Sequence, residues 1–312
     1  MVRASVKVRA EYLAIAGAAS LGVIKLATGL AINSIGLISA AADSLIDIAI
    51  SSLNLFSIRL ADSPADEGHP YGHGKVENLA GLAQTTVIVV VGVWVLVEAV
   101  GRLVRGTQPE HAEWGVAVMA VSVAVSWLIA RHLRQVGTRT DSVVLLADSL
   151  HYATDVWTNG GVLLALALLW LTGSGVFDPL IALVVGTVIL GSAYKLLVRS
   201  VRDLMDAALP EAEQRAIEAI IRSHKFVVSS HDLRTRRSGS QRQIDFSVVA
   251  CRHLPLGEAH DLVDHIEKEI EAKVLNSHVV VHAEPCSPTC TLTNRCVLWA
   301  RQDDLLAHEP QR

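Results

Sequence analysis

The chain has 312 residues, is 51% hydrophobic but only 19% charged, and carries a net charge of -4 at pH 7. Its mean hydropathy is +0.40. Soluble domains carry about 25% charged residues, so this composition favours a membrane protein. The slightly acidic balance excludes a dominant nucleic-acid-binding role, because proteins that bind polyanions usually present a basic face. The charged N-terminus leads into an apolar segment too long for a signal-peptide core, so we expect no cleavable signal.

The apolar residues concentrate before about residue 200 and form six segments long enough to span a bilayer, which takes about 20 helical residues. We place the spans at residues 11–33, 36–60, 79–101, 113–133, 143–171 and 177–198. Lys and Arg are enriched at the N-terminus, in the loops after the second and fourth spans, and after the sixth. By the positive-inside rule, both termini face the cytoplasm. We therefore expect residues 1–207 to form a six-helix transmembrane domain.

Two of these spans carry pairs of ionisable residues four positions apart. Asp43 and Asp47 lie in AADSLID, and His151 and Asp155 lie in ADSLHYATD. Residues four apart project from one face of a helix. A charged side chain at the bilayer centre costs about 3 kcal/mol even on the lenient insertion scales, so these groups need a compensating partner. Three carboxylates and an imidazole can ligate a tetrahedral divalent ion, which predicts a metal site inside the membrane.

Two other charged residues lie within the predicted spans. Lys25 in the first span is either a counter-charge for the acidic site or a lysine that reaches the membrane interface, and we favour the second interpretation. Asp148 lies one turn before His151 and is expected to support a ligand or to line an entrance rather than to bind the ion.

The loop between the second and third spans, ADSPADEGHPYGHGKVEN, offers a second set of metal ligands. Asp66, His69 and His73 are spaced so that one carboxylate and two imidazoles can meet a single ion. The alternative is a solvated loop with two ordinary histidines, and spacing alone favours that alternative.

Residues 208–287 have the patterns of a soluble α+β domain. We expect helices at 210–224 and 257–274, and strands at 231–239, 242–253 and 278–284. The order αββαβ packs two helices on one face of a small sheet, as in ferredoxin-like domains. Residues 288–312 form a tail without a strong pattern. All four cysteines lie in the last third of the chain, after residue 208, and we expect reduced thiols if that part is cytosolic. They are Cys251, Cys286, Cys290 and Cys296.

Motifs along the chain resemble those of the cation diffusion facilitator family. DSLID in the second span, HPYGHGK in the next loop and LHYATD in the fifth span are followed by ALP, HDLRTR, LPLGEAH and VVVHAEPC, between about residues 11 and 287. The likeness is greatest to bacterial zinc and ferrous-iron efflux antiporters. It implies a homodimer in the bacterial inner membrane that exports divalent metal ions in exchange for protons. Zn²⁺ is the expected cargo, with Cd²⁺, Fe²⁺ and Co²⁺ as other candidates.

The resemblance implies three metal sites. The transport site takes Asp43, Asp47, His151 and Asp155, the loop site takes Asp66, His69 and His73, and the cytoplasmic site takes His231, His260, His282 and Glu284. Ser247 stands where the family has a further ligand histidine, and Glu284 replaces the usual Asp. One cytoplasmic ion is therefore expected to bind more weakly unless Asp245, on the same face of the strand, replaces the missing ligand. Zinc at this site would stabilise the dimer.

Several residues around these sites are also assigned by the resemblance. Lys75 and Asp206 match a charged pair that ties the membrane domain to its neighbour near the dimer junction. Cys286, Cys290 and Cys296 are either extra thiolate ligands or plain thiols in the tail, and their spacing favours plain thiols because it matches no standard zinc knuckle.

His151 is expected to carry the proton, because imidazole titrates near neutral pH and zinc requires deprotonated ligands. Two other function classes are disfavoured. A membrane metallohydrolase needs an open coordination position and a general base, whereas four protein ligands on zinc leave no vacancy. A membrane metal sensor does not need ionisable ligands at mid-membrane. Manganese is disfavoured as cargo because manganese-selective relatives tend to have Asp where this chain has His151. The sequence therefore predicts a metal–proton antiporter rather than an enzyme.

Overall fold

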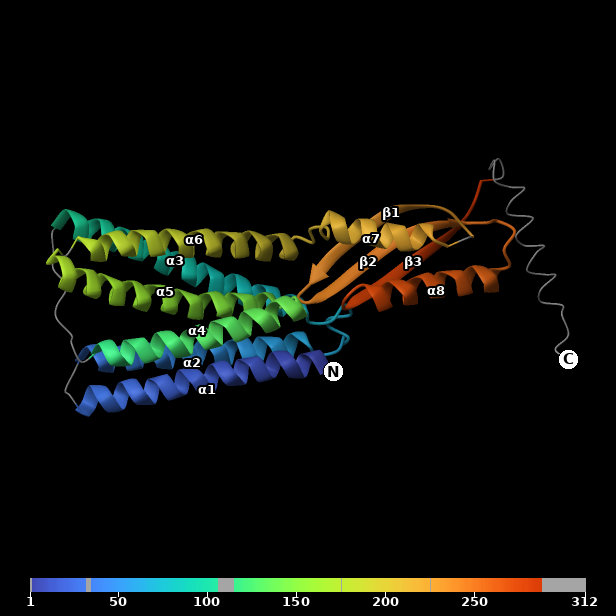
Figure 1. The fold of residues 1–312 in the computed structure, drawn as a ribbon. Coiled ribbons are helices and arrows are strands. Elements are labelled where there is room, and N and C mark those ends of the chain that lie inside the picture. The colour runs from blue at the N-terminus through green and yellow to red at the C-terminus, as the bar shows by residue number, and fades with distance from the viewer. Residues whose placement is uncertain (1, 32–34, 106–114, 175, 225, 288–312) are drawn as a thin grey trace, which may run out of the picture. The chain divides into compact units, whose positions relative to one another are not determined.

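A computed structural model describes residues 2–31, 35–105, 115–174, 176–224 and 226–287 (Figure 1). The chain divides into two compact units, Met1–Leu204 and Met205–Arg312, close to the boundary expected at residue 207. The predicted tail, with Cys290 and Cys296, lies outside the described residues.

The first unit consists of six long helices in its described part. They are α1 (Val2–Ala31), α2 (Ile35–Ala61), α3 (Lys75–Arg105), α4 (Gly115–Thr140), α5 (Val143–Thr172) and α6 (Phe177–Leu204). Each helix contains a stretch long and apolar enough to cross a membrane, which confirms the six predicted spans. Some helices exceed those spans because polar turns continue them beyond the apolar segments. The clearest case is α1, which begins at Val2 rather than at residue 11.

Three helix pairs make the most extensive contacts in this unit: α1 with α2, α4 with α5, and α3 with α6. The α3–α6 pair, seen side by side in Figure 1, depends on reciprocal glycines. A Cβ atom at Gly92 of α3 would lie 2.8 Å from Leu190 Cδ2, and one at Gly186 of α6 would lie 2.7 Å from Leu96 Cδ2. Small residues let membrane helices approach closely, so each glycine accepts a leucine of the partner helix.

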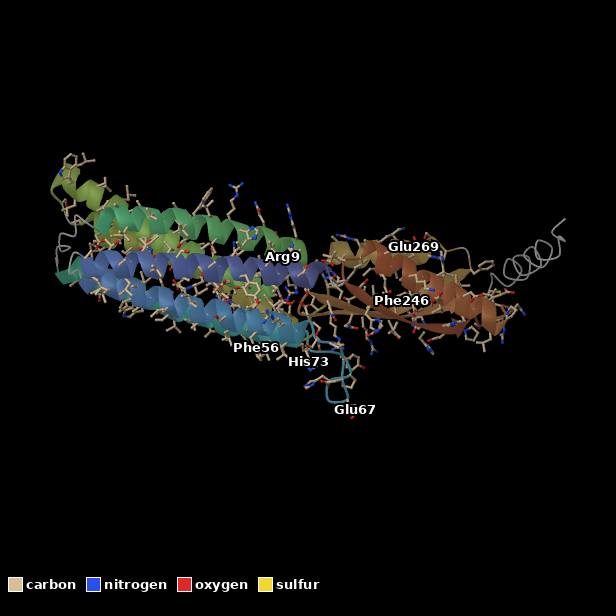
Figure 2. The ribbon with its side chains drawn as sticks, turned by 90° about the horizontal axis from the view of Figure 1, so that it is seen from below. Arg9, Phe56, Glu67, His73, Phe246 and Glu269 are labelled. Atoms are coloured by element: carbon tan, nitrogen blue, oxygen red, sulfur yellow. The ribbon has the colours of Figure 1, made fainter. Side chains whose placement is uncertain are left out.

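Large apolar side chains cover the outside of the helices. Phe56, which Figure 2 shows on the outer side of α2, is exposed, and so are Trp94 and Trp170. In water such a surface would associate or aggregate, whereas in a bilayer it contacts lipid chains. Together with the six apolar spans, this surface identifies the first unit as an integral membrane domain.

A buried ion pair joins α1, α3 and α5 near one end of the bundle. Lys7 Nζ donates to Glu77 Oε2 at 3.0 Å, and both side chains are buried. Glu77 also accepts a short hydrogen bond from Ser142 Oγ. Ser142 is the N-cap of α5, and its Oγ accepts from the Leu145 N–H. Because an unpaired buried charge is strongly destabilising, these contacts hold the three helix ends together.

The second unit contains two helices and a three-stranded sheet in its described part. They are α7 (Glu211–Arg222), β1 (Val227–Ser238), β2 (Gln241–Ala250), α8 (Leu256–Lys273) and β3 (Ser277–Pro285). The strand order is β1-β2-β3, with β1 antiparallel and β3 parallel to β2. Gly239, at φ +61°, lies in the β1–β2 turn. A parallel pair needs a crossover connection, which α8 supplies. The predicted αββαβ order is confirmed.

Alternation along β2 gives the sheet two different faces. Ile244, Phe246 and Val248 are buried in a core shared with both helices. The other members of this core are Leu209, Ile217, Ile220, Ile221, Ile266, Ile270 and Val279. Asp245 and Ser247 have the opposite parity and therefore lie on the face that the helices leave open. Both helices thus cover one face, as predicted, and Asp245 and Ser247 lie on the other.

We expect Ile266→Ala to lower the free energy of unfolding of the second unit by about 2–5 kcal/mol, because it removes a buried side chain of α8. Ile266 is 0% exposed, whereas Leu256 on the same helix is 87% exposed. Leu256→Ala is therefore the matched control and should change stability by at most about 0.5 kcal/mol. Hydrogen exchange of the β2 amides in the full chain measures both effects. Equal effects of the two variants would contradict the assigned core.

Candidate metal centres

Helices α2 and α5 bring three of the four predicted transport ligands together. His151 Nε2 lies 2.9 Å from Asp47 Oδ1. One ligand atom from each of Asp47, His151 and Asp155 lies within 4.8 Å of the other two, and all three residues are half-buried. Ligand atoms on a tetrahedral zinc ion are about 3.4 Å apart, given metal–ligand distances of about 2.1 Å. This group can therefore hold a divalent ion with only small side-chain movements.

The fourth predicted ligand, Asp43, is not part of this group in the described structure. Its side chain is exposed, whereas that of Asp47 is half-buried. Four residues of an α-helix advance the chain by about 6 Å and overshoot a full turn by about 40°, so the two carboxylates need not converge. The spacing predicts a shared helix face, and convergence on one ion is a stricter requirement.

Lys25 of α1 points toward α2, which departs from the interface-reaching lysine that we favoured from the sequence. Its Nζ donates to Ser44 Oγ at 3.0 Å, and the residue is half-buried. Ser44 lies between Asp43 and Asp47 on α2. The ammonium group therefore lies near the acidic residues of α2, as the counter-charge alternative requires.

A buried polar network lies beside the ligand group. Asp148 is fully buried and accepts hydrogen bonds from Gln84 Nε2 at 2.8 Å and from Ser51 Oγ at 3.3 Å. Ser51 Oγ also lies 3.3 Å from Tyr152 Oη, and the Tyr152 ring lies 5.6 Å from that of His151. Asp148 therefore supports the packing of α2, α3 and α5 and does not line an entrance. Its neutral partners gave no sequence signal, because single polar residues in apolar helices have no diagnostic spacing.

Asp66, His69 and His73 converge in the loop between α2 and α3, where Figure 2 labels His73. Asp66 Oδ1 lies 3.3 Å from His69 Nδ1, and its Oδ2 lies 3.3 Å from His73 Nε2. The two imidazole centroids are 4.5 Å apart. Gly72, at φ +78°, provides the left-handed turn between the histidines. The loop therefore presents the three ligands as one cluster rather than as separate solvated residues.

The backbone of this loop also prepares the carboxylate. The N–H of His69 donates to Asp66 Oδ1 at 2.6 Å. This hydrogen bond is the main cause that lowers the pKa of Asp66 below its ordinary value. The carboxylate therefore stays ionised, and able to bind a cation, to lower pH than an isolated aspartate.

The predicted cytoplasmic ligands come together only in part. Strand pairing places Ser247 opposite both His231 of β1 and His282 of β3, so the three residues lie on one face of the sheet. Glu284 Oε2 lies 3.4 Å from His231 Nε2, and its Oε1 lies 3.9 Å from His282 Nε2. Two imidazoles and one carboxylate thus gather around the position of Ser247.

Asp245 and His260 do not join them. Asp245 is exposed two positions along β2, about 7 Å away by strand rise. His260 is exposed on α8, the helix that covers the other face of the sheet. Within the described part of the chain, neither the five predicted cytoplasmic ligands nor His231, His282 and Glu284 alone bring one ligand atom each within 4.8 Å of all the others. The two histidines approach different oxygens of Glu284.

The cysteine expectation needs one correction. Cys286 does not lie in the tail: its N–H donates to Ala250 O at 2.9 Å, and its side chain is buried beside Cys251. Val228, Val249 and Leu254 complete this apolar cluster. Both described cysteines are therefore packed thiols without a disulfide, and Cys286 is not positioned as a ligand.

Lys75 and Asp206 lie in different units, so their predicted pairing stays a prediction. Lys75 begins α3. Within the second unit, Arg236 Nη1 donates to Asp206 Oδ2 at 3.3 Å.

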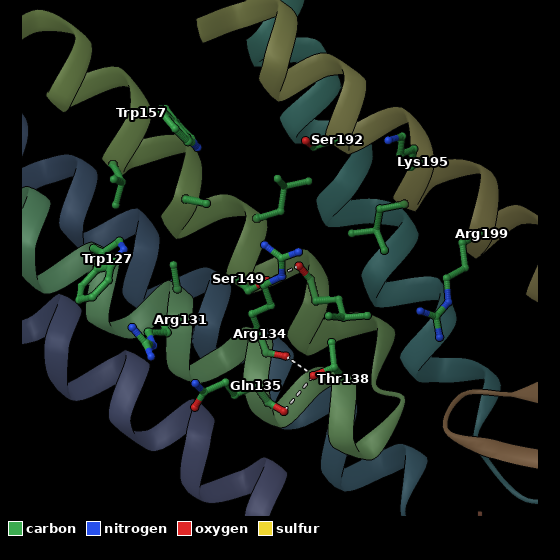
Figure 3. Close-up of a pocket in the computed structure, with 16 residues that line it drawn as sticks. Trp127, Arg131, Arg134, Gln135, Thr138, Ser149, Trp157, Ser192, Lys195 and Arg199 are labelled. Carbon is green, nitrogen blue, oxygen red and sulfur yellow. Dashed lines mark hydrogen bonds between the residues drawn. The ribbon is translucent and has the colours of Figure 1, made fainter.

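A cavity of about 740 Å³ opens between α4, α5 and α6 (Figure 3). Its polar and aromatic lining residues include Trp127, Arg131, Arg134, Trp157, Lys195 and Arg199. None of the predicted metal ligands lines it. Its four cationic side chains would repel a divalent cation, so we do not place the path of the ion there.

Most of the chain is similar to known proteins. Residues 12–205 match the cation efflux transmembrane domain, and residues 209–286 match the cytoplasmic domain of cation efflux proteins. Cation-efflux pumps FieF of Salmonella paratyphi A and Salmonella agona are each 37% identical over 279 residues, which is 89% of this chain and 93% of theirs. A solved CzrB structure is 29% identical, covers 26% of this chain and 100% of its own, and has a TM-score of 0.25. The solved Zn form of CzrB is 32% identical, covers 25% of this chain and 90% of its own, and has a TM-score of 0.23.

We expect Asp66→Asn to weaken zinc binding by the loop at least about tenfold, because it removes the charged oxygen ligand from a cluster of three. Glu67→Gln is the matched control, since Glu67 is an exposed neighbouring acid outside the cluster. A zinc titration of the full chain against a competing chelator at pH 7 measures the difference.

The pH dependence should follow from the lowered pKa of Asp66. A carboxylate with a lowered pKa is fully ionised at any pH above its ordinary pKa, and so contributes fully to zinc binding there. It loses this contribution only as the pH falls through the lowered pKa. Asp66 should therefore remain ionised between pH 7 and 5, and Glu67→Gln should leave the slope of zinc affinity against pH unchanged in that range. Loop affinity that is equal in Asp66→Asn and wild type would remove Asp66 from the site.

Proposed function

The chain belongs to the cation efflux family, and from this premise we propose that it exports Zn²⁺ and similar divalent transition-metal ions from the cytoplasm in exchange for protons. The observation that carries this proposal is the convergence of Asp47, His151 and Asp155 between two membrane-crossing helices. Ionisable residues in membrane spans are expensive, and they usually mark an ion or substrate pathway. A bound divalent cation offsets the two carboxylates.

Proton coupling follows from the atom that His151 presents. Its Nε2 lies 2.9 Å from Asp47 Oδ1, the distance of a hydrogen bond, so a proton on Nε2 is shared with that carboxylate. The same Nε2 lone pair must be free to bind a metal ion. Proton and metal ion therefore compete for one position. If that position opens alternately to the two sides of the membrane, uptake of a proton outside releases the ion, and uptake of the ion inside releases the proton.

Asp43 is the candidate for the fourth ligand. It lies one turn from Asp47 on α2 and carries a carboxylate on the same helix face. A modest rotation of α2 would bring it toward His151 and Asp155. We therefore propose that the described arrangement holds the ion with three protein ligands and that Asp43 completes the tetrahedron when α2 moves.

The ligand set favours zinc over manganese. One imidazole and three carboxylates suit Zn²⁺, Cd²⁺, Co²⁺ and Fe²⁺, whereas Mn²⁺ prefers oxygen ligands alone. Among these ions Zn²⁺ is the one most often bound by four ligands in a tetrahedron, because its filled d shell imposes no other geometry.

The second unit would act in a homodimer whose subunits lie in the bacterial inner membrane with both termini in the cytoplasm. Zinc held by His231, His282 and Glu284 would neutralise the carboxylate and stabilise this assembly by mass action. Asp245 and His260, the other two predicted ligands, would have to approach this group to complete the coordination. Lys75 with Asp206 would form the charged pair between domains. The chemistry of the gathered donors, two imidazoles and a carboxylate, suits zinc.

We expect Asp155→Ala to abolish zinc-driven proton flux in sealed proteoliposomes, because it removes a ligand from the group in the membrane. Asp178→Asn is the control, since Asp178 pairs with Arg102 at 3.4 Å in the first turn of α6, outside the group. Both variants should elute as folded protein in size-exclusion chromatography. Wild-type flux in a folded Asp155→Ala variant would refute the transport site. Asp43→Ala in the same assay tests the fourth ligand.

His151→Asp should let Mn²⁺ compete with Zn²⁺ for transport, because an all-oxygen site suits the harder ion. The measurement is uptake of labelled zinc into vesicles against a range of Mn²⁺ concentrations. We expect the concentration of Mn²⁺ that halves zinc uptake to fall at least about tenfold relative to wild type. An unchanged competition curve would show that His151 does not bind the transported ion.

A further inference from the structure

Three residues outside all the predicted sites gather at the junction of α7 and α8. His224 follows the last turn of α7, and His265 and Glu269 lie one turn apart on α8. Glu269 Oε2 lies 3.2 Å from His224 Nε2 and 3.9 Å from His265 Nε2. One ligand atom from each residue lies within 4.8 Å of the other two, and the two imidazole rings meet edge to face with centroids 5.3 Å apart. These separations bracket the spacing of about 3.4 Å expected around tetrahedral zinc.

The backbone sets the tautomer of His224. Its Nδ1 lies 2.9 Å from the carbonyl oxygen of Ile220. A carbonyl only accepts hydrogen bonds, so Nδ1 must carry the hydrogen and donate it. In the neutral ring, the lone pair is then on Nε2, the atom that faces Glu269. Metal-binding histidines usually have their other ring nitrogen bonded in this way, which orients the ring. The His224 side chain is only 9% exposed, so this orientation is held by packing.

Glu269 is oriented in the same manner. Lys273, one turn later on α8, donates to Oε1, which leaves Oε2 directed at the two histidines. The hydrogen bond from Lys273 is the main cause that lowers the pKa of Glu269 below its ordinary value. With Oε1 bonded to Lys273, Oε2 is the carboxylate oxygen available to a metal ion held with the two imidazoles. Figure 2 shows Glu269 on α8.

The neighbouring acids of α8 have a different use. Glu267 Oε1 accepts from the Val281 N–H at 3.0 Å, and Glu271 Oε1 accepts from the Val279 N–H at 3.2 Å. Both carboxylates thus satisfy backbone groups of β3. Glu269 has no such contact with the sheet among the described hydrogen bonds, and it is the acid of this helix that faces two imidazoles.

We propose that His224, His265 and Glu269 form a further binding site for a divalent transition-metal ion such as Zn²⁺, with two nitrogen ligands and one oxygen ligand. Water takes the fourth position of the tetrahedron. The site is separate from the proposed cytoplasmic site, because His231, His282 and Glu284 belong to the sheet face that the helices leave open. One ligand follows the end of α7 and the other two lie on α8, so a bound ion cross-links the end of α7 to α8.

Zinc titration of the metal-free full chain in detergent micelles, against a competing chelator, tests the site. We expect His265→Asn to lose one zinc equivalent per chain, or to weaken that equivalent at least about 30-fold. The His265 side chain is 70% exposed, so this change should leave the fold intact. His278→Asn is the matched control: His278 is 66% exposed and lies 3.7 Å from Glu271. Among the described residues it belongs to no group of three possible ligands. It should bind as many zinc ions as wild type.

A second measurement separates metal binding from a simple histidine–carboxylate ion pair. In wild type and in His278→Asn, zinc should slow the hydrogen exchange of amides in the last turn of α7 and at His224. It should not do so in His265→Asn or Glu269→Gln. Unchanged zinc stoichiometry and unchanged exchange in His265→Asn would overturn the proposal and leave the cluster as an ion pair. The readouts are binding and exchange, so they succeed or fail independently of transport, which His265→Asn should leave at the wild-type level.

Discussion

The cost of burying a charged side chain constrains two clusters of the membrane unit. Within hydrocarbon, a lone ammonium or carboxylate is strongly unfavourable, and the chain meets this condition in two ways. At one end of the bundle, Lys7 and Glu77 neutralise each other and join three helices. Deeper in the bundle, Asp47 and Asp155 have only one imidazole between them as an ionic partner within their cluster. The excess of negative charge is the property that makes the second cluster a place for a cation.

The cluster of Asp47, His151 and Asp155 draws its residues from two different helix pairs. Asp47 belongs to the α1–α2 pair, whereas His151 and Asp155 belong to the α4–α5 pair. Direct contact between α2 and α5 is much smaller than the contact within either pair. The pair of Asp47 and His151 therefore links α2 to α5 at a place where these two helices have little other contact, whereas the two helix pairs also pack on each other through α1 and α4. In the exchange that we propose, replacing a proton by a metal ion would change the geometry of that link and so couple binding to movement.

The second unit separates packing from binding by strand alternation. One face of the sheet supplies the apolar core and is covered by α7 and α8, so it cannot hold polar ligands. The open face carries His231, His282 and Glu284 around Ser247. On the covered side, ligand groups can occur only at the edge, where α7 ends and α8 passes. The cluster of His224, His265 and Glu269 lies at that edge.

The sequence by itself determined the six spans, the αββαβ order and three residues of the membrane cluster. Hydropathy suffices for the spans because a bilayer admits few alternatives to apolar helices of fixed length. Strand alternation and turn residues suffice for the small sheet. The pairing of Asp47 with His151 was predictable because an ionisable side chain in hydrocarbon is strongly unfavourable unless it lies against an opposite charge.

The tertiary structure decided what depends on the direction of side chains and on the packing of distant segments. Helical spacing placed Asp43 on the face of Asp47, but only the packing of α2 against α5 showed that its carboxylate lies outside the cluster. Lys25 turned toward Ser44 because α1 packs on α2, which no property of α1 alone indicates. The meeting of His224 with His265 had no sequence signal, because it arises where the end of one helix crosses another and spacing along the chain does not record that contact.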